Sequence, residues 1–113
     1  MTKVVFYLTD KGEVLGFEAS GHAGYAEAGS DIVCAAVSAL TQATAGGLSE
    51  VVKAPVQTKM NEDTGYLSCV IDSSCDGETL SKAQILLVTL KMALTEISRD
   101  YPGTIRIIIR ERR

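Results

Sequence analysis

A chain of 113 residues, 46% hydrophobic and 22% charged, can bury a core of its own and predicts a single compact domain, residues 1–113. Its net charge of −3 argues against a general affinity for nucleic acid. It shows no signal-peptide pattern, no apolar run of membrane-spanning length and only three scattered cysteines, which predicts a cytoplasmic protein with reduced thiols and no membrane contact.

Two strands are predicted first, over residues 3–9 and 13–20, joined by a hairpin turn at 10–12. A helix follows from Ser30 or Asp31, both good N-cap residues, to about Val51. Its buried stripe is predicted from apolar spacing of three and four, at Val33, Val37, Leu40, Thr44, Leu48 and Val51.

A second hairpin is predicted from strands over residues 55–60 and 66–72, and a second helix over 78–100. The buried stripe of that helix runs through Leu80, Ala83, Leu87, Leu90, Leu94, Ile97 and Tyr101. A last strand is expected over 104–110. This ββαββαβ order predicts an α/β two-layer sandwich, in which two main helices cover one face of a mixed or antiparallel sheet.

Cys34 and His22 are the candidate reactive pair. Cys34 falls at the end of the first turn of the predicted helix, where unpaired backbone N–H groups and the helix dipole favour an anion such as a thiolate. Helical geometry puts it at the margin of the buried stripe. His22 comes just after the second strand, at the other end of the same loop, and an imidazole can serve as base or as cationic partner.

The residues around this pair have candidate supporting roles. Asp31 lies one turn before Cys34 and can orient the imidazole, or can act only as a favourable charge at the helix start. Ser38 lies one turn after Cys34, on its face. The small residues of the loop would let a peptide backbone approach, and the candidate substrate loop is Gly21, Ala23, Gly24, Tyr25 and Gly29.

The remaining cysteines and the basic C-terminus fit structural roles better. Cys69 shares one face of its predicted strand with Leu67 and Ile71 and should face the core. Cys75 lies in a predicted exposed turn. Spacing typical of zinc ligands is missing, so no metal and no cofactor are expected. The arginines of the last strand, at 106, 110, 112 and 113, should protect an edge strand rather than bind nucleic acid directly.

The block from Gly21-His22-Ala23 through Asp31-Ile32-Val33-Cys34 to Ser38 resembles the ribosomal-processing cysteine protease Prp family, also called YsxB-like. The likeness extends over the whole chain. It implies that Cys34 is the nucleophile and His22 the base of a cysteine endopeptidase. It further implies homodimers, and a substrate that is the extended N-terminus of bacterial large-subunit ribosomal protein twenty-seven, whose removal permits ribosome assembly.

Two other classes of function stay open at this point. One is a thiol redox sensor in which Cys34 pairs with Cys75 after oxidation, which requires the two thiols to lie within disulfide reach. The other is a non-enzymatic ribosome-assembly module that binds through the arginine edge.

Overall fold

The computed structural model describes residues 1–21 and 30–112. The chain opens with strands β1 (Thr2–Leu8) and β2 (Val14–Ser20), and helix α1 (Ser30–Gly46) continues into the π-helical turn η1 (Gly47–Val51). The remaining elements are β3 (Val56–Asn61), β4 (Tyr66–Ile71), α2 (Gly77–Asp100) and β5 (Ile105–Glu111). The predicted order and the two-layer α/β fold are confirmed, and each boundary lies within one residue of its prediction.

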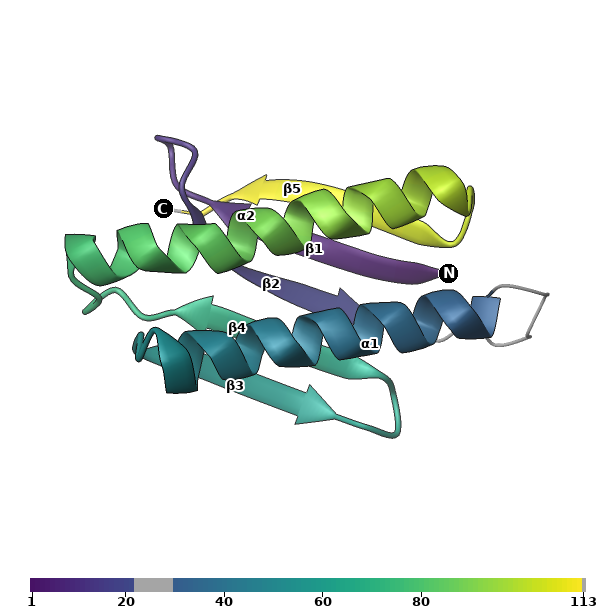
Figure 1. Ribbon diagram of the computed structural model, residues 1–113, viewed down its shortest axis with the longest axis horizontal. Coiled ribbons are helices and arrows are strands. Elements are labelled where there is room, and N and C mark those ends of the chain that lie inside the picture. The colour runs from purple at the N-terminus through teal and green to yellow at the C-terminus, as the bar shows by residue number, and fades with distance from the viewer. Residues whose placement is uncertain (22–29, 113) are drawn as a thin grey trace.

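The five strands form one mixed sheet in the order β3-β4-β2-β1-β5. β1 and β5 are parallel, and the other neighbours are antiparallel. Two crossovers, β2-α1-β3 and β4-α2-β5, start from oppositely directed strands and move in opposite directions across the sheet. Because such crossovers are right-handed, both helices are expected on the same face, and Figure 1 shows them side by side there.

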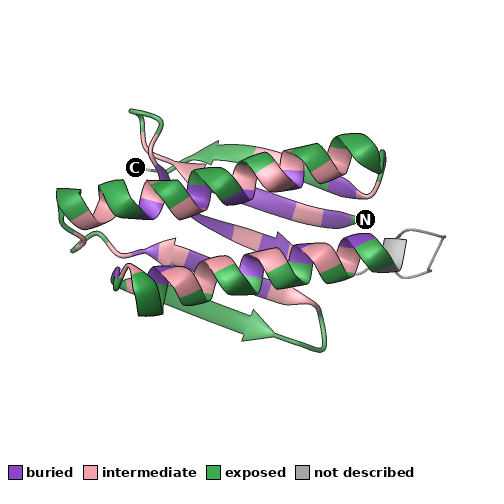
Figure 2. Cartoon of the chain, in the orientation of Figure 1, coloured by how far each residue is buried: buried purple, intermediate pink, exposed green. Residues whose placement is uncertain are grey.

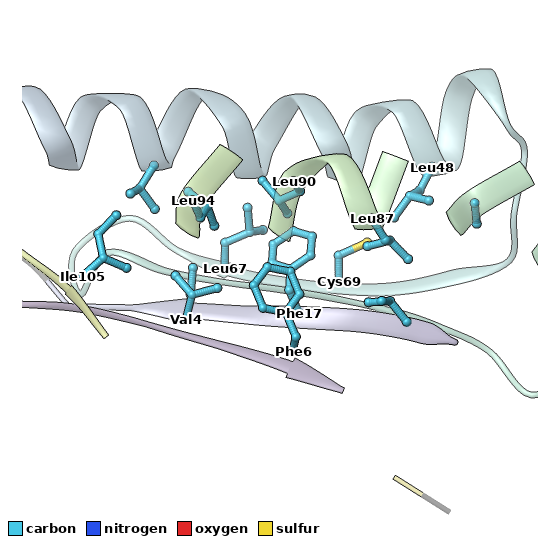
Figure 3. Close-up of a cluster of buried hydrophobic side chains, with 14 of the residues drawn as sticks. Val4, Phe6, Phe17, Leu48, Leu67, Cys69, Leu87, Leu90, Leu94 and Ile105 are labelled. Carbon is cyan, nitrogen blue, oxygen red and sulfur yellow. The ribbon is translucent and has the colours of Figure 1, made fainter. Parts of the chain in front are cut away.

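The core lies between this sheet and the two helices (Figure 3). Phe6, Phe17 and Cys69 from the sheet are fully buried, as are Leu48 of η1 and Leu87 and Leu94 of α2. The predicted stripes are largely confirmed, but two of their ends are wrong. Val51 is 79% exposed because the π-helical turn shifts the helical phase, and Tyr101 is 42% exposed because it lies past the last turn of α2.

Strand β5 is an edge strand of the sheet, as expected for its arginines. Arg112 lies over the ring of Tyr7, with its guanidinium carbon 5.1 Å from the ring centroid. Its backbone N–H also donates to the carbonyl of Leu8. This arginine is therefore engaged in holding the C-terminal end of β5 to β1.

The apolar segment Ile32–Val51 corrects one sequence-based expectation, since its 20 residues have a mean hydropathy of 1.4 and reach membrane-spanning length by composition. Its side chains Val33, Val37 and Leu48 are buried in the core against the sheet. Packing onto the sheet therefore accounts for the apolar residues on the inner face of this helix.

Candidate active site

The sheet register gathers distant segments at one edge of the molecule. Strands β2 and β3 are both antiparallel to β4, so their carboxyl ends lie at the same end of the sheet, which is the edge meant here. There Ala19 pairs with Leu67, which also pairs with Met60. Lys3 pairs with Ser20, which brings the amino end of β1 to that edge too. Helix α1 begins above it, because the chain reaches α1 directly after β2.

A cavity of about 240 Å³ opens at this edge, between α1 and the β3–β4 hairpin. The helix contributes one wall, through Cys34, Val37, Ser38, Thr41 and Gln42. The hairpin contributes the opposite wall, through Met60, Asn61, Glu62, Gly65, Tyr66 and Leu67. The ends of β1 and β2 complete it with Thr2, Ala19 and Gly21. Its buried lining is mostly apolar, with Ala19, Val37 and Leu67 beside the buried Thr2 and Thr41.

Cys34 lines the cavity as the fifth residue of α1 and is half-buried. Its neighbour Val33 points into the core, so the helical turn of about 100° per residue leaves Cys34 at the margin of the buried face, as expected. Thr41, two turns further on, is also buried, and its hydroxyl donates to the Val37 carbonyl at 2.8 Å. The thiol is thus placed by a well-packed helix.

Thr2 is a site residue that sequence reasoning missed. Its side chain is 5% exposed, lines the cavity and places Oγ1 3.8 Å from the sulfur of Cys34. The two residues are 32 positions apart in sequence. They come together only because the strand order brings the start of β1 beneath α1. No sequence motif indicates that a threonine at position 2 belongs to the site.

The other predicted site residues fall into two groups. Ser38 lines the cavity, is exposed and accepts a hydrogen bond from Gln42 Nε2 at 2.9 Å. Gly21 also lines it. Asp31 lies in the first turn of α1, and its side chain is outside the described part. Four further predicted residues and the base lie outside the described residues altogether: Ala23, Gly24, Tyr25, Gly29 and His22.

The two other cysteines lie away from the cavity. Cys69 is fully buried in the core, as predicted, and burial raises the pKa of its thiol. The predicted turn before Cys75 is confirmed, since the Cys75 N–H donates to the Asp72 carbonyl. Its predicted exposure is wrong, because Cys75 is half-buried and packs against the core. Burial and then the charge of Asp76 raise the pKa of the Cys75 thiol.

The position of Cys75 also bears on the redox alternative. It lies between β4 and α2, at the end of the molecule opposite the first turns of α1, which carry Cys34 (Figure 1). That placement counts against a Cys34–Cys75 disulfide, which needs Cα atoms about 4.4–6.8 Å apart. It counts equally against a zinc site shared by these cysteines.

The model of the family described as "Cysteine protease Prp" matches residues 1–106. The chain belongs to the Prp family. A curated member, the ribosomal processing cysteine protease Prp of Bacillus subtilis, is 36% identical over 98 residues, which cover 87% of each chain. The family assignment confirms the sequence resemblance and supports a peptidase.

Solved Prp structures share the fold. Two crystal structures of the essential ribosomal processing protease Prp from S. aureus superpose with TM-scores of 0.83 and 0.81, at 24% and 25% sequence identity. Each covers 97% of this chain and all of the other. The five-stranded sheet with two helices on one face is therefore the Prp architecture.

Proposed function

We propose that this Prp-family chain is an endopeptidase in which Cys34 is the nucleophile and His22 the base. The observation that carries the proposal is the position of the Cys34 sulfur. It lines a cavity at the sheet edge where β2 ends, on the first turns of a helix, in a chain of a cysteine protease family. His22 follows directly after Gly21, which lines the same cavity.

The reaction follows from these roles. His22 takes the thiol proton, and the Cys34 thiolate attacks the scissile carbonyl to form a new C–S bond. The tetrahedral intermediate collapses by breaking the C–N bond, and the imidazolium gives its proton to the leaving amine. Water, deprotonated by His22, then attacks the thioester, which releases the carboxylate product and restores the thiol.

The developing oxyanion needs donors that are already in place. A helix leaves the N–H groups of its first turn without an intrahelical acceptor, and α1 begins at Ser30. We therefore assign the oxyanion to the N–H groups of that first turn rather than to the N–H of Cys34, which lies one turn inside the helix. Asp31 and Ser38 are proposed to support the site, Asp31 by orienting the imidazole and Ser38 by binding the peptide.

The proposed substrate is the extended N-terminus of large-subunit ribosomal protein twenty-seven, cut in the bacterial cytoplasm. The S. aureus relative has been crystallised with a substrate peptide and with a covalently linked product peptide. A covalent product is what a thioester route would leave on a cysteine. The apolar part of the cavity lining, formed by residues such as Ala19, Val37 and Leu67, suits an apolar side chain of the peptide.

Intact-protein mass spectrometry tests the substrate. The protein is incubated with ribosomal protein twenty-seven that carries the extension, and separately with a copy that lacks it. One cut that releases the N-terminal segment is expected from the first, and no change in the second. His22→Ala should lose this cleavage while keeping a wild-type melting temperature. An extended ribosomal protein that stays intact would overturn the substrate assignment.

We also propose that the active form is a homodimer that pairs through the outer face of α2, defined by Ile85, Val88 and Met92. These side chains are 70%, 51% and 56% exposed and follow one another at three- and four-residue steps. Figure 2 shows exposed segments recurring along the length of α2. Beside them, residues 32–49 contain no charged side chain. Apolar, charge-poor helix faces of this kind are typical of the centre of an interface.

The charges at the two ends of this face support a second copy as the occupant. Glu78 and Lys82 lie near the start of α2, and Glu96 and Arg99 near its end. An antiparallel copy centred between Val88 and Thr89 places Ile85 against Met92 of the other copy. The same arrangement brings Glu78 close to Arg99 of the other copy and Lys82 close to its Glu96, so these four charges are complementary across the two copies.

A further inference from the structure

We infer that Thr2 is a positioning residue for the Cys34 thiol and donates a hydrogen bond to its sulfur during the reaction. The inference rests on the proposed role of Cys34 as nucleophile. Thr2 Oγ1 lies 3.8 Å from Cys34 Sγ, within the range of hydrogen bonds to sulfur, and both residues line the cavity. A hydroxyl can donate or accept, but a thiolate can only accept. Once Cys34 has lost its proton, the donor must be Thr2.

The hydroxyl is held in place by the sheet. The N–H of Thr2 donates to the Thr104 carbonyl at 3.0 Å, and Thr2 pairs with Ile105 in the parallel ladder between β1 and β5. On its other side, Lys3 pairs with Ser20 of β2. A β-branched side chain on a fixed backbone has few rotamers, so the hydroxyl is preorganised.

Burial makes the contact effective. The Thr2 side chain is 5% exposed, so water does not compete freely for its hydroxyl. A hydrogen bond from such a donor to an ionised acceptor is about twice as strong as one between neutral groups. The bond therefore favours the thiolate over the thiol and fixes the direction from which the sulfur attacks. A threonine present only to fill a strand position would do neither.

Thr2→Val removes the hydroxyl and keeps the shape, whereas Thr2→Ser keeps the hydroxyl. Thr58→Val is a matched control, because the Thr58 hydroxyl also donates to a cysteine sulfur, that of Cys69 at 3.6 Å, away from the cavity. All are made in a Cys75→Ala background. The readouts are the rate of Cys34 alkylation by iodoacetamide against pH and kcat/KM for the extended ribosomal protein, with melting temperatures as a check on folding.

Thr2→Val should move the midpoint of the alkylation profile to higher pH and lower kcat/KM by about tenfold or more, as expected for a lost hydrogen bond to a charged group. Thr2→Ser should keep an alkylation midpoint and a kcat/KM close to those of the Cys75→Ala background. Thr58→Val should match that background in both quantities. A Thr2→Val profile and kcat/KM that coincide with the background would overturn the inference. If that result accompanied an inactive Cys34→Ala, the proposed function would stand without Thr2. An active Cys34→Ala would remove the proposed function itself.

Discussion

Gly21 packs directly against the backbone of Met1: a Cβ atom on Gly21 would lie 2.8 Å from the Met1 carbonyl oxygen. Gly21 also has φ +101°, a backbone conformation that residues with a Cβ atom rarely adopt. It follows the last residue of β2 and precedes His22. This contact therefore fixes the direction in which the chain leaves the sheet toward the proposed base.

Gly21→Ala should for this reason lower both stability and activity. Backbone strain of this kind costs about 1–3 kcal/mol, and relief of the clash with Met1 would shift residue 22. Gly12→Ala is the matched control, since Gly12 has φ +85° but open space around its Cα. Thermal melts and cleavage assays below both melting temperatures check this. Gly21→Ala that cleaves as fast as Gly12→Ala would show that the contact does not serve the site.

The three cysteines should react in a fixed order with limited iodoacetamide. Cys34 lines the cavity and should be labelled first at neutral pH. Burial and the charge of Asp76 raise the pKa of Cys75, so its thiolate fraction at a given pH is below that of an ordinary thiol, and its labelling needs higher pH. Cys69 is fully buried and should react only on unfolding.

Peptide mapping by mass spectrometry reads out this order. Asp76→Asn removes the negative charge beside Cys75 and should bring its labelling to lower pH, while leaving Cys34 unchanged. Labelling of Cys69 or Cys75 ahead of Cys34 in the folded protein would contradict the assigned environments.

The pairing of α2 with a second copy can be tested by light scattering after gel filtration. Ile85→Asp would bury an unpaired charge at the centre of the proposed interface and should raise the dimer dissociation constant about a hundredfold or more. Ile109→Asp is the matched control, since Ile109 is also exposed but lies on β5, outside the face of α2. It should leave the dissociation constant unchanged. An Ile85→Asp dimer as tight as the Ile109→Asp dimer would place the interface elsewhere.

Charge reversal gives the sharper version of that experiment, because the proposed pairing predicts compensation. Glu78→Arg alone, or Arg99→Glu alone, places like charges opposite one another and should weaken the dimer. The double variant restores opposite signs at both ends and should recover it. The effect is modest, since exposed ion pairs contribute only about 0.2–1 kcal/mol each. A wild-type monomer, or a double variant no better than either single one, would contradict the pairing.

Asp76 caps α2 and links stability to pH. Its carboxylate accepts a hydrogen bond from the Thr79 N–H at 2.7 Å, and this bond holds the pKa of Asp76 below its ordinary value. The contribution is therefore fully present above the ordinary Asp pKa and is lost as pH falls through the lowered one. Asp76→Ala should melt at a lower temperature than wild type at neutral pH, and the difference should shrink in acid.

Asp76→Asn is the control for the cap, because asparagine keeps an acceptor for the Thr79 N–H. It should melt close to wild type at neutral pH. A difference between Asp76→Ala and wild type that stays constant as pH falls would show that the carboxylate charge does not contribute.

Local pattern was enough to predict the elements of the fold, but not their arrangement. The helices and strands follow from apolar spacing that a single segment carries, as in Val33 and Val37. The strand order depends on contacts between distant segments, such as Lys3 with Ser20, which no local pattern encodes. The π-helical turn that exposes Val51 depends on packing in the same way.

The same division holds at the site. Cys34 could be predicted because its place on a helix start is a local property, and the structure puts it on a cavity. Thr2 could not, because its contact with Cys34 joins the first strand to the first helix across the sheet edge. The opposite cavity wall from the β3–β4 hairpin was missed for the same reason.

The most direct test of the proposed chemistry is the time course of cleavage of extended ribosomal protein twenty-seven by wild type, Cys34→Ala and Cys75→Ala, followed by mass spectrometry. Cys75→Ala should cleave at the wild-type rate, because Cys75 lies away from the cavity. Cys34→Ala, with an unchanged melting temperature, should give no product when wild type has gone to completion. Cleavage by folded Cys34→Ala would contradict the role of Cys34 as the nucleophile.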